Sequence, residues 1–349
     1  VTVFLTNMEN IINKLHCADS KKFLTKVDDE CIDLIITSPP YWNAVEYEKN
    51  KKYTYEKYID FLFEIWCECE RILKPNGKLA INTPILPIPQ DIIKQDTRHI
   101  KNINNDIEKS ILENLNLNLF SLYIWQKQTS KLMFGSYPYP GNLLENNTIE
   151  FINIFVKPGK SKKKPDYVKN ANKIKQREWT DLIQQVWFMY PQDVKRLKNH
   201  PAPYPEKLPA RLMRMFTSGA TKSFKGDIVL DPFVGTGTTC VAAKKMKRQF
   251  IGIDNEKSYI EYAKGRLSKA KEGEEVNCLI GNSKHLSKDE LVDLKYEIDH
   301  SYKKKTKQEE KEKLLEKNKK RNYGRNVKKN NQKKFGFIKD KPSQKKFDF

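Results

Sequence analysis

Near the start of the chain, an apolar stretch runs into a turn whose residue types could do chemistry: Asp33-Leu34-Ile35-Ile36-Thr37-Ser38-Pro39-Pro40-Tyr41-Trp42. A short apolar run bounded by a turn is typical of a strand buried in a parallel sheet. The two prolines fix φ and remove two N–H donors, so the turn is stiff and offers carbonyl acceptors. With a hydroxyl and two aromatic rings, such a turn suits a flat molecule that carries an amino group. A Pro-Pro turn that only closes a strand is the alternative, and this stretch alone does not decide between them.

A second stretch, residues 226–239, reads as a strand, a Gly-x-Gly turn and the start of a helix. The glycines let the backbone approach a ligand, and the helix N-terminus presents N–H groups. The next strand, Phe250–Ile253, is followed by Asp254, which comes 23 residues after Asp231. That is near the spacing at which an acidic residue accepts hydrogen bonds from ribose hydroxyls. The two β-α units therefore predict a site for a nucleoside cofactor.

The details of this turn favour a cofactor with positive charge. The third glycine of a dinucleotide-binding turn is missing, and Asp231 stands where it would repel a pyrophosphate. The turn also lacks the Gly-Lys-Ser/Thr sequence of a P-loop. An acidic residue facing the loop suits a sulfonium amino acid.

The remaining periodicity predicts further helices and strands around these two stretches. After Thr54, apolar residues recur every three or four positions until Pro75-Asn76-Gly77 ends the helix, and its aromatic residues are expected in the core. A strand follows this helix, and such a β-α-β unit requires a parallel sheet. Asp19 stands before a short helix near Lys21, so from local pattern alone it reads as an N-cap. The other predicted strands are Lys14–Cys17, Ile32–Thr37, Lys78–Thr83, Ser121–Lys127 and Ile149–Val156, and the other predicted helices are Ile107–Leu115, Pro209–Ser218, Thr239–Met246 and Ser258–Leu267.

Charge predicts a polyanionic partner. The 349 residues carry a net charge of +21, and residues 301–349 alone hold 19 Lys and Arg against 6 Asp and Glu. This balance points to nucleic acid, although the last segment also reads as a solvated, flexible tail. Lysines interleaved with tryptophans in residues 157–199 suit a nucleic-acid surface, with a solvated linker as the alternative. The Tyr/Pro loop 135–142 reads equally as a recognition loop or as a rigid hairpin loop.

Other classes are disfavoured. No apolar run is long enough to cross a membrane, and the first residues do not resemble a signal peptide. The six cysteines form no Cys-x-x-Cys pair, and with five histidines no zinc spacing is present, so no metal site is predicted. Reduced thiols in a cytoplasmic protein are the expected state.

Taken together, the two stretches resemble the β group of amino DNA methyltransferases, which use S-adenosylmethionine. The order is characteristic: Ser-Pro-Pro-Tyr first, a recognition region next, and Asp-Pro-Phe-x-Gly-x-Gly last, preceded by His200-Pro201-Ala202. The resemblance covers about residues 8–270. It implies an α/β fold, a doubly wound and mostly parallel Rossmann-like sheet whose chain order is a circular permutation of the common methyltransferase. It also implies a division into four parts: 1–127 catalytic half, 128–199 recognition region, 200–270 cofactor-binding half and 271–349 basic tail.

The resemblance also implies roles for individual residues. The catalytic pocket would consist of Ser38, Pro39, Pro40 and Tyr41. The residues around the cofactor would be Asp19 at the adenine amino group, Asp254 at the ribose, and, toward the methionine end, Thr37, His200, Pro201, Ala202, Asp231, Pro232, Phe233, Gly235, Gly237 and Thr238.

This chemistry requires the target base to leave the duplex, because its amino group is otherwise out of reach. Tyr41 would stack on the base, while the Ser38 hydroxyl and the Pro39 carbonyl accept its amino hydrogens. No cysteine follows a proline, so methylation at cytosine C5 is disfavoured. Serine before Pro-Pro is similar to N4-cytosine enzymes, whereas Asp or Asn there is commoner in N6-adenine enzymes, which remain the alternative.

The expected partner is double-stranded DNA, with a separate cognate restriction endonuclease as a further expectation and the oligomeric state open. An RNA or protein methyltransferase is a second hypothesis, but those chains usually place the Gly-rich stretch first. A nucleic-acid-binding protein with an inactive core is a third, and intact Ser38, Asp231 and Asp254 argue against it.

Overall fold

The computed structural model of the protein describes residues 8–40, 42, 54–88, 99–127, 138–141, 145, 147–190 and 204–280. Half of the Tyr/Pro loop 135–142 and the whole segment 301–349 lie outside these residues. The strands are β1 Lys14–Cys17, β2 Ile32–Thr37, β3 Leu73–Pro84, β4 Leu86–Ile88, β5 His99–Lys101, β6 Asn118–Lys127, β7 Ile149–Val156, β8 Val186–Met189, β9 Ile228–Asp231 and β10 Gln249–Asp254. The helices are α1 Met8–Ile11, α2 Ser20–Leu24, α3 Tyr55–Ile72, α5 Ile103–Asn114, α6 Asp166–Ala171, α7 Gln176–Leu182, α8 Lys207–Phe216, α9 Thr238–Lys245 and α10 Lys257–Lys269.

Within the described residues, the main sheet has eight strands in the order β1-β10-β9-β2-β3-β7-β6-β8. The first five are parallel, β7 runs antiparallel to both of its neighbours, and β8 is parallel to β6. From β9 the chain passes through α9 to β10 on one side, and from β2 it passes through α3 to β3 on the other. The sheet therefore reverses its winding between β9 and β2, and ligands of such folds bind at the carboxyl ends of the strands at this reversal. The predicted doubly wound sheet is confirmed.

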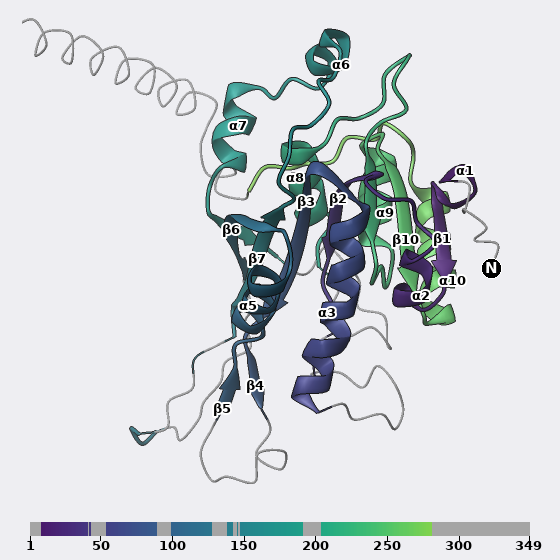
Figure 1. Cartoon of the computed structure of the whole chain (residues 1–349). Coiled ribbons are helices and arrows are strands. Elements are labelled where there is room, and N and C mark those ends of the chain that lie inside the picture. Colours follow the sequence, from purple (N-terminus) through teal and green to yellow (C-terminus); the bar gives the residue numbers. More distant parts are fainter. Residues whose placement is uncertain are drawn as a thin grey trace, which may run out of the picture. The chain divides into compact units, whose positions relative to one another are not determined.

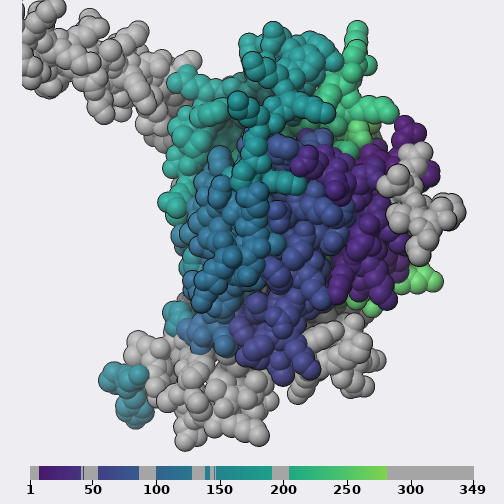
Figure 2. All heavy atoms as spheres, viewed as in Figure 1, coloured from purple at the N-terminus to yellow at the C-terminus, as the bar shows by residue number. Residues whose placement is uncertain are grey.

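Helices cover both faces of the sheet (Figure 1). One core lies between the sheet and α2, α3 and α5, and the other between the sheet and α7, α8, α9 and α10. In the space-filling view, the purple, indigo and blue segments of α2, α3 and α5 abut one another over the first face (Figure 2). Two apolar layers on a sheet that is buried on both sides explain why β2 is apolar at nearly every position.

Helix α3 shows how the sequence pattern makes this layer. Thr54 caps the helix, since its hydroxyl accepts a hydrogen bond from the Lys57 N–H. The predicted aromatic core residues Tyr58 and Trp66 are buried, together with the apolar residues that share their face. Each such side chain contributes about 1.5–3 kcal/mol of hydrophobic free energy when it leaves water.

The strand after α3 begins earlier than predicted. Helix α3 ends at Ile72, before the predicted stop, and residues 75–77 lie inside β3 as a local irregularity with Asn76 at φ 63°. The N–H of Asn76 donates to the carbonyl of Lys157 just beyond β7, and the N–H of Lys157 donates to the carbonyl of Gly77. The paired neighbouring strand therefore extends β3 through residues whose types are typical of a turn.

The stretch 128–199 does not form a separate layer in its described part. Strands β7 and β8 belong to the main sheet, and Trp187 of β8 is fully buried. Trp179 of α7 instead exposes 55% of its surface. Of the aromatic residues predicted for a nucleic-acid surface, Trp187 is therefore a core residue and Trp179 a surface residue.

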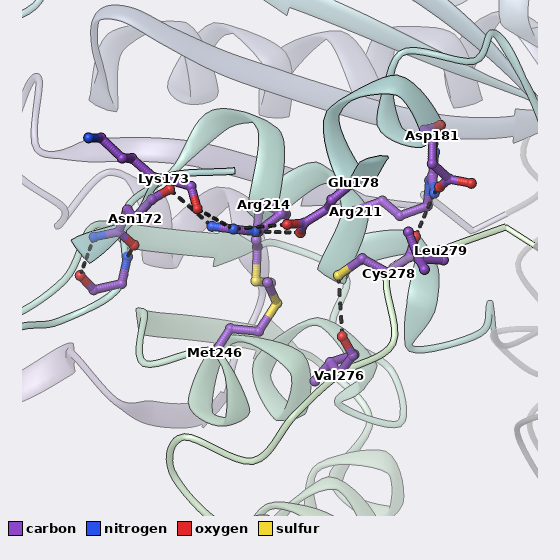
Figure 3. A network of polar contacts seen from close by, with 12 residues as sticks. Asn172, Lys173, Glu178, Asp181, Arg211, Arg214, Met246, Val276, Cys278 and Leu279 are labelled. Atoms are coloured by element: carbon purple, nitrogen blue, oxygen red, sulfur yellow. Dashed lines mark hydrogen bonds and ion pairs between the residues drawn. The ribbon is translucent and has the colours of Figure 1, made fainter. Parts of the chain in front are cut away.

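Two arginines of α8 fasten this stretch to the cofactor half (Figure 3). Arg211 is fully buried and pairs with Asp181, and its guanidinium also donates to the Cys278 carbonyl at 2.5 Å. Arg214 makes a two-pronged pair with Glu178, with N···O distances of 2.5 and 3.0 Å. We call these four side chains the α8 junction.

The α8 junction also holds residues 276–280 against the core. The N–H of Ile280 donates to the Asp181 carboxylate at 3.1 Å, and both Cys278 and Ile280 are buried. Residues 276–280 therefore pack against the same core as α8. Among the described residues, no helix is long and apolar enough to cross a membrane.

Candidate active site

The Gly-rich turn between β9 and α9 is closed against the end of β10. The N–H of Val234 donates to the Ile253 carbonyl at 2.9 Å, and the N–H of Gly235 donates to the Asp254 carboxylate at 2.8 Å. Gly237 has φ 82°, and a Cβ at this position would lie 2.7 Å from the Cβ of Ala263. A glycine is therefore required there by both backbone conformation and space.

Arg266 of α10 also holds the Gly-rich turn. Its guanidinium donates to the Thr236 carbonyl at 2.8 Å and to the Thr238 hydroxyl at 2.9 Å. The turn is held by contacts within the chain, because the N–H groups of Gly235 and Gly237 and the carbonyl of Thr236 all have partners there.

Asp231 ends β9 and is completely buried. Its carboxylate accepts from the Thr239 hydroxyl at 2.6 Å, the Tyr204 hydroxyl at 3.0 Å and the Phe233 N–H at 3.1 Å. Burial raises the pKa of this carboxyl to about 6, and the hydrogen bonds only partly offset that shift. Among the described residues no cation pairs with Asp231, so a positively charged group bound nearby would gain from its charge.

Asp254 ends β10 and has both carboxylate oxygens engaged by N–H groups, those of Gly235 and Glu256. Burial raises the pKa of this carboxyl as well. Each oxygen has a second lone pair, so the two bonds leave acceptor capacity.

Asp19 lies at the same edge of the sheet, since Cys17 at the end of β1 pairs with Asp254 and the Ala18 N–H donates to the Asp254 carbonyl. The exposed Asp19 side chain accepts from the Lys22 N–H at 2.9 Å and caps α2. The N-cap interpretation is therefore confirmed, while a role at adenine stays a prediction.

At the end of β2, Thr37 is fully buried, Pro39 is buried and Ser38 is half-buried. The Ser38 hydroxyl donates to the main-chain carbonyl of Asn82 at 3.0 Å. Trp42 packs edge-on against Tyr55, with ring centroids 5.1 Å apart. The serine, the buried Asp231 and the partly buried Asp254 thus lie at one edge of the sheet.

Four predicted site residues, Tyr41, His200, Pro201 and Ala202, lie outside the described residues. Phe233 also packs against α3. The centroid of its ring lies 6.3 Å from that of Phe61 and 6.5 Å from that of Trp66, both on this helix. Pro232 contributes its carbonyl, which accepts from the buried Ser20 hydroxyl and so ties α2 to the turn.

Sequence reasoning missed several residues that shape the site. Tyr204 and Thr239 hold Asp231, Arg266 supports the Gly-rich turn, and Asn82 holds Ser38. Asn82 gave a signal, because it is a polar residue in the apolar run Leu79-Ala80-Ile81 and is only 2% exposed. Arg266 gave none, since a basic residue late in a helix is common for local reasons.

Comparison with known protein families shows which family the chain belongs to. The model of the DNA methylase family matches residues 32–265, which include both the Ser-Pro-Pro-Tyr turn and the Gly-rich turn. The chain belongs to the DNA methylase family. A general methyltransferase domain also matches residues 223–347. Membership confirms the resemblance drawn from the two turns, and with it S-adenosylmethionine as the cofactor of this DNA methylase.

Curated relatives align with most of the chain. Type II methyltransferase M.MjaI of Methanocaldococcus jannaschii is 29% identical over 279 residues, which cover 70% of this chain and 88% of that protein. Type II methyltransferase M.BglI of Bacillus subtilis is 27% identical over 313 residues, covering 71% and 84%. This DNA methylase therefore aligns with nearly the whole length of both relatives.

Solved structures show the same fold. TTHA0409 of Thermus thermophilus, in its complex with S-adenosyl-L-methionine, is 28% identical with a TM-score of 0.59, and the match covers 74% of this chain and 95% of that one. The cytosine-N4-specific PvuII DNA methyltransferase is 18% identical with a TM-score of 0.57, covering 81% and 91%. At that identity the second likeness shows the fold of this DNA methylase and nothing finer.

Proposed function

We propose that this DNA methylase transfers the methyl group of S-adenosylmethionine to the exocyclic N4 of cytosine in double-stranded DNA. The observation that carries the proposal is the Ser38 hydroxyl at the end of β2, in the position where N6-adenine enzymes commonly have a carboxylate or an amide. The type II names of the relatives support a role in a restriction-modification system, which would place the enzyme in the cytoplasm with a separate cognate endonuclease.

The cofactor would lie across the ends of β9, β10 and β1. Asp254 would accept from the ribose hydroxyls, and Asp19 would use its second carboxylate oxygen for the adenine amino group. Thr37, Pro232, Phe233, Gly235, Gly237 and Thr238 would border the methionine end, as would His200, Pro201 and Ala202. Asp231 supplies the negative charge on this side, which favours a bound sulfonium.

The target cytosine would flip out of the duplex and stack on Tyr41 beside Pro39 and Pro40. The Ser38 hydroxyl oxygen and the Pro39 carbonyl would accept the two hydrogens of the amino group. Both bonds strengthen as the nitrogen becomes positive during attack on the methyl carbon, so they stabilise the transition state more than the ground state. S-adenosylmethionine supplies an activated methyl group, and the protein contributes alignment and acceptors.

Residues 128–199 would contain the surface that selects the DNA sequence. Their described part exposes Lys160, Lys162, Lys163 and Trp179. Lysines and a stackable ring suit a phosphate backbone and its bases.

The test is methylation of unmodified double-stranded DNA with a labelled methyl group, followed by digestion to nucleosides and separation of the products. We expect N4-methylcytosine as the labelled product. N6-methyladenine as the labelled product would show that the target base is adenine and not cytosine. Label in RNA or protein but not in DNA would overturn the proposal. Ser38→Ala serves as the matched control for transfer that depends on this site.

A further inference from the structure

A series of hydrogen bonds leads from Ser38 into the sheet. The Ser38 hydroxyl donates to the main-chain carbonyl of Asn82 at 3.0 Å, and the Asn82 side-chain amide donates to the Glu150 carboxylate at 2.5 Å. The other Glu150 oxygen accepts from the Lys127 ammonium at 2.8 Å. We call Asn82, Glu150 and Lys127 the Ser38 support.

Strand register brings these residues together from three strands. Glu150 of β7 pairs with Pro84 of β3 on one side and with Trp125 of β6 on the other. Asn82 is two residues from Pro84, and Lys127 is two residues from Trp125. Residues two apart share a face of a strand, so the three side chains are diagonal neighbours on one face.

Burial makes the Ser38 support rigid. Asn82 is 2% exposed and Glu150 is 4% exposed. A carboxylate at that depth needs charged or hydrogen-bonding partners, and Lys127 and Asn82 supply one on each oxygen. A buried ion pair contributes little net stability, because desolvation of both charges offsets their attraction. The contribution of the Lys127–Glu150 pair is therefore to position Asn82 more than to stabilise the fold.

The geometry determines the polarity of Ser38. A serine hydroxyl has one hydrogen to donate, and here that hydrogen goes to Asn82. The oxygen can then meet a further group only as an acceptor. The Asn82 amide also lies 3.5 Å from the Ser38 oxygen, so Glu150 orients a residue that contacts Ser38 from both its main chain and its side chain.

We propose that Glu150, with Lys127, is a positioning residue for methyl transfer. The Asn82 main-chain carbonyl takes the Ser38 hydrogen, and Glu150 fixes the Asn82 side chain, whose amide lies 3.5 Å from the Ser38 oxygen. Together these contacts orient the Ser38 oxygen so that it faces the target amino group as an acceptor. The inference rests on the proposed role of Ser38 and is independent of which base carries the amino group.

The first experiment compares Glu150→Gln in two backgrounds. In the otherwise unchanged enzyme, we expect kcat for methyl transfer to DNA to fall about tenfold, because misplaced groups lose rate steeply, with the dissociation constant for S-adenosylmethionine unchanged. In the Ser38→Ala background, measured by single-turnover transfer of labelled methyl, we expect no further loss. Dependence of one substitution on the other isolates an effect that passes through Ser38.

Glu178→Gln is the matched control. It makes the same carboxylate-to-amide change in an ion pair, that with Arg214 in the α8 junction. We expect it to lower stability without lowering kcat. If Glu150→Gln does not fold, the double variant Lys127→Met with Glu150→Gln removes both charges, leaves none buried alone, and takes its place in the comparison.

Two outcomes would overturn the inference: an unchanged kcat in Glu150→Gln, or the same tenfold loss in the Ser38→Ala background. The labelled base is identified in the same assay on the unsubstituted enzyme. N6-methyladenine there would overturn the proposed base and leave the role of Glu150 standing, so the two proposals fail separately.

Discussion

The α8 junction and the strand-end site both bury charge, but they balance it in different ways. In the junction, Arg211 pairs with Asp181 and Arg214 pairs with Glu178, so each charge meets its opposite. At the strand ends, Asp231 and Asp254 are surrounded by hydroxyl and N–H donors, and among the described residues neither makes an ion pair.

The difference separates architecture from function. A region whose charges are already paired has no electrostatic demand for a ligand and serves to join elements. A region that buries carboxylates with neutral donors alone keeps negative charge, which a bound cation can match. A sulfonium cofactor is such a cation, so the imbalance at the strand ends is what binding would correct.

The largest expected effect comes from breaking the junction. Arg211→Met leaves the Asp181 carboxylate without its charged partner and the Cys278 carbonyl without a donor. We expect a loss of about 3–5 kcal/mol in the free energy of unfolding, measured by urea denaturation. The kcat of the folded fraction should not change. A stability loss below about 1 kcal/mol would contradict a structural role for this pair.

At the strand ends, Ser38→Ala should lower kcat and leave the stability unchanged. We expect kcat to fall by about 100- to 1000-fold, or about 3 kcal/mol and more, because an acceptor that strengthens in the transition state is lost. The thermal midpoint and the cofactor dissociation constant, measured by calorimetry, should stay near those of the unsubstituted enzyme. Unchanged turnover would remove Ser38 from the mechanism.

The buried Asp231 predicts a pH dependence that the junction does not. Its pKa is raised to about 6 from an ordinary value near 4, so the folded state binds this proton more tightly than the unfolded chain does. The corresponding stability is present below about pH 4 and is lost as the pH rises to about 6, by about 2–3 kcal/mol. Relative to Asp231→Asn, the unsubstituted protein should lose that amount between these pH values in urea denaturation. A pH-independent difference would show that this carboxyl titrates at its ordinary pKa.

The smallest effect is expected from Asp254→Asn. Loss of the charge should weaken binding of S-adenosylmethionine about tenfold, or about 1.4 kcal/mol, with little change in kcat at saturation. Asp166→Asn is the matched control, because it makes the same carboxylate-to-amide change at an exposed position of α6, outside the strand-end site. Calorimetric titration measures both. An unaltered dissociation constant for Asp254→Asn would count against contact with the ribose.

Strands with a clear apolar run could be predicted from the sequence. Strands β1, β2 and β7 have the predicted bounds, because each is a short apolar or alternating run ended by turn residues. Strand β8 was not predicted, since Val186–Met189 is short and its burial comes from pairing with β6. Helices α6 and α7 were missed for a similar reason: they are short and polar, and α7 is fastened by the α8 junction.

The same limit applies to the candidate site. Ser38, Asp231 and Asp254 could be predicted from the two turns, because glycine and proline mark turns in the sequence and acidic residues next to them stand out at strand ends. Of the Ser38 support, Asn82 alone gave a local signal, as a polar residue after an apolar run, and its link to Glu150 gave none. Asn82 and Glu150 are 68 residues apart, and only the antiparallel register of β3 and β7 makes them neighbours.

The strand order also sets a schedule for synthesis on the ribosome. Strand β9 lies between β10 and β2, yet it is made long after β2 and β3. In the described sheet β1 pairs with β10 alone, so β1 has no neighbouring strand until β10 has been made, about 230 residues later. A nascent chain that stops before β9 holds Ser38 on a strand with one bare edge. The turn after β2 therefore acquires its second neighbouring strand only after about 190 further residues have been made, and until then an unpaired strand edge is exposed.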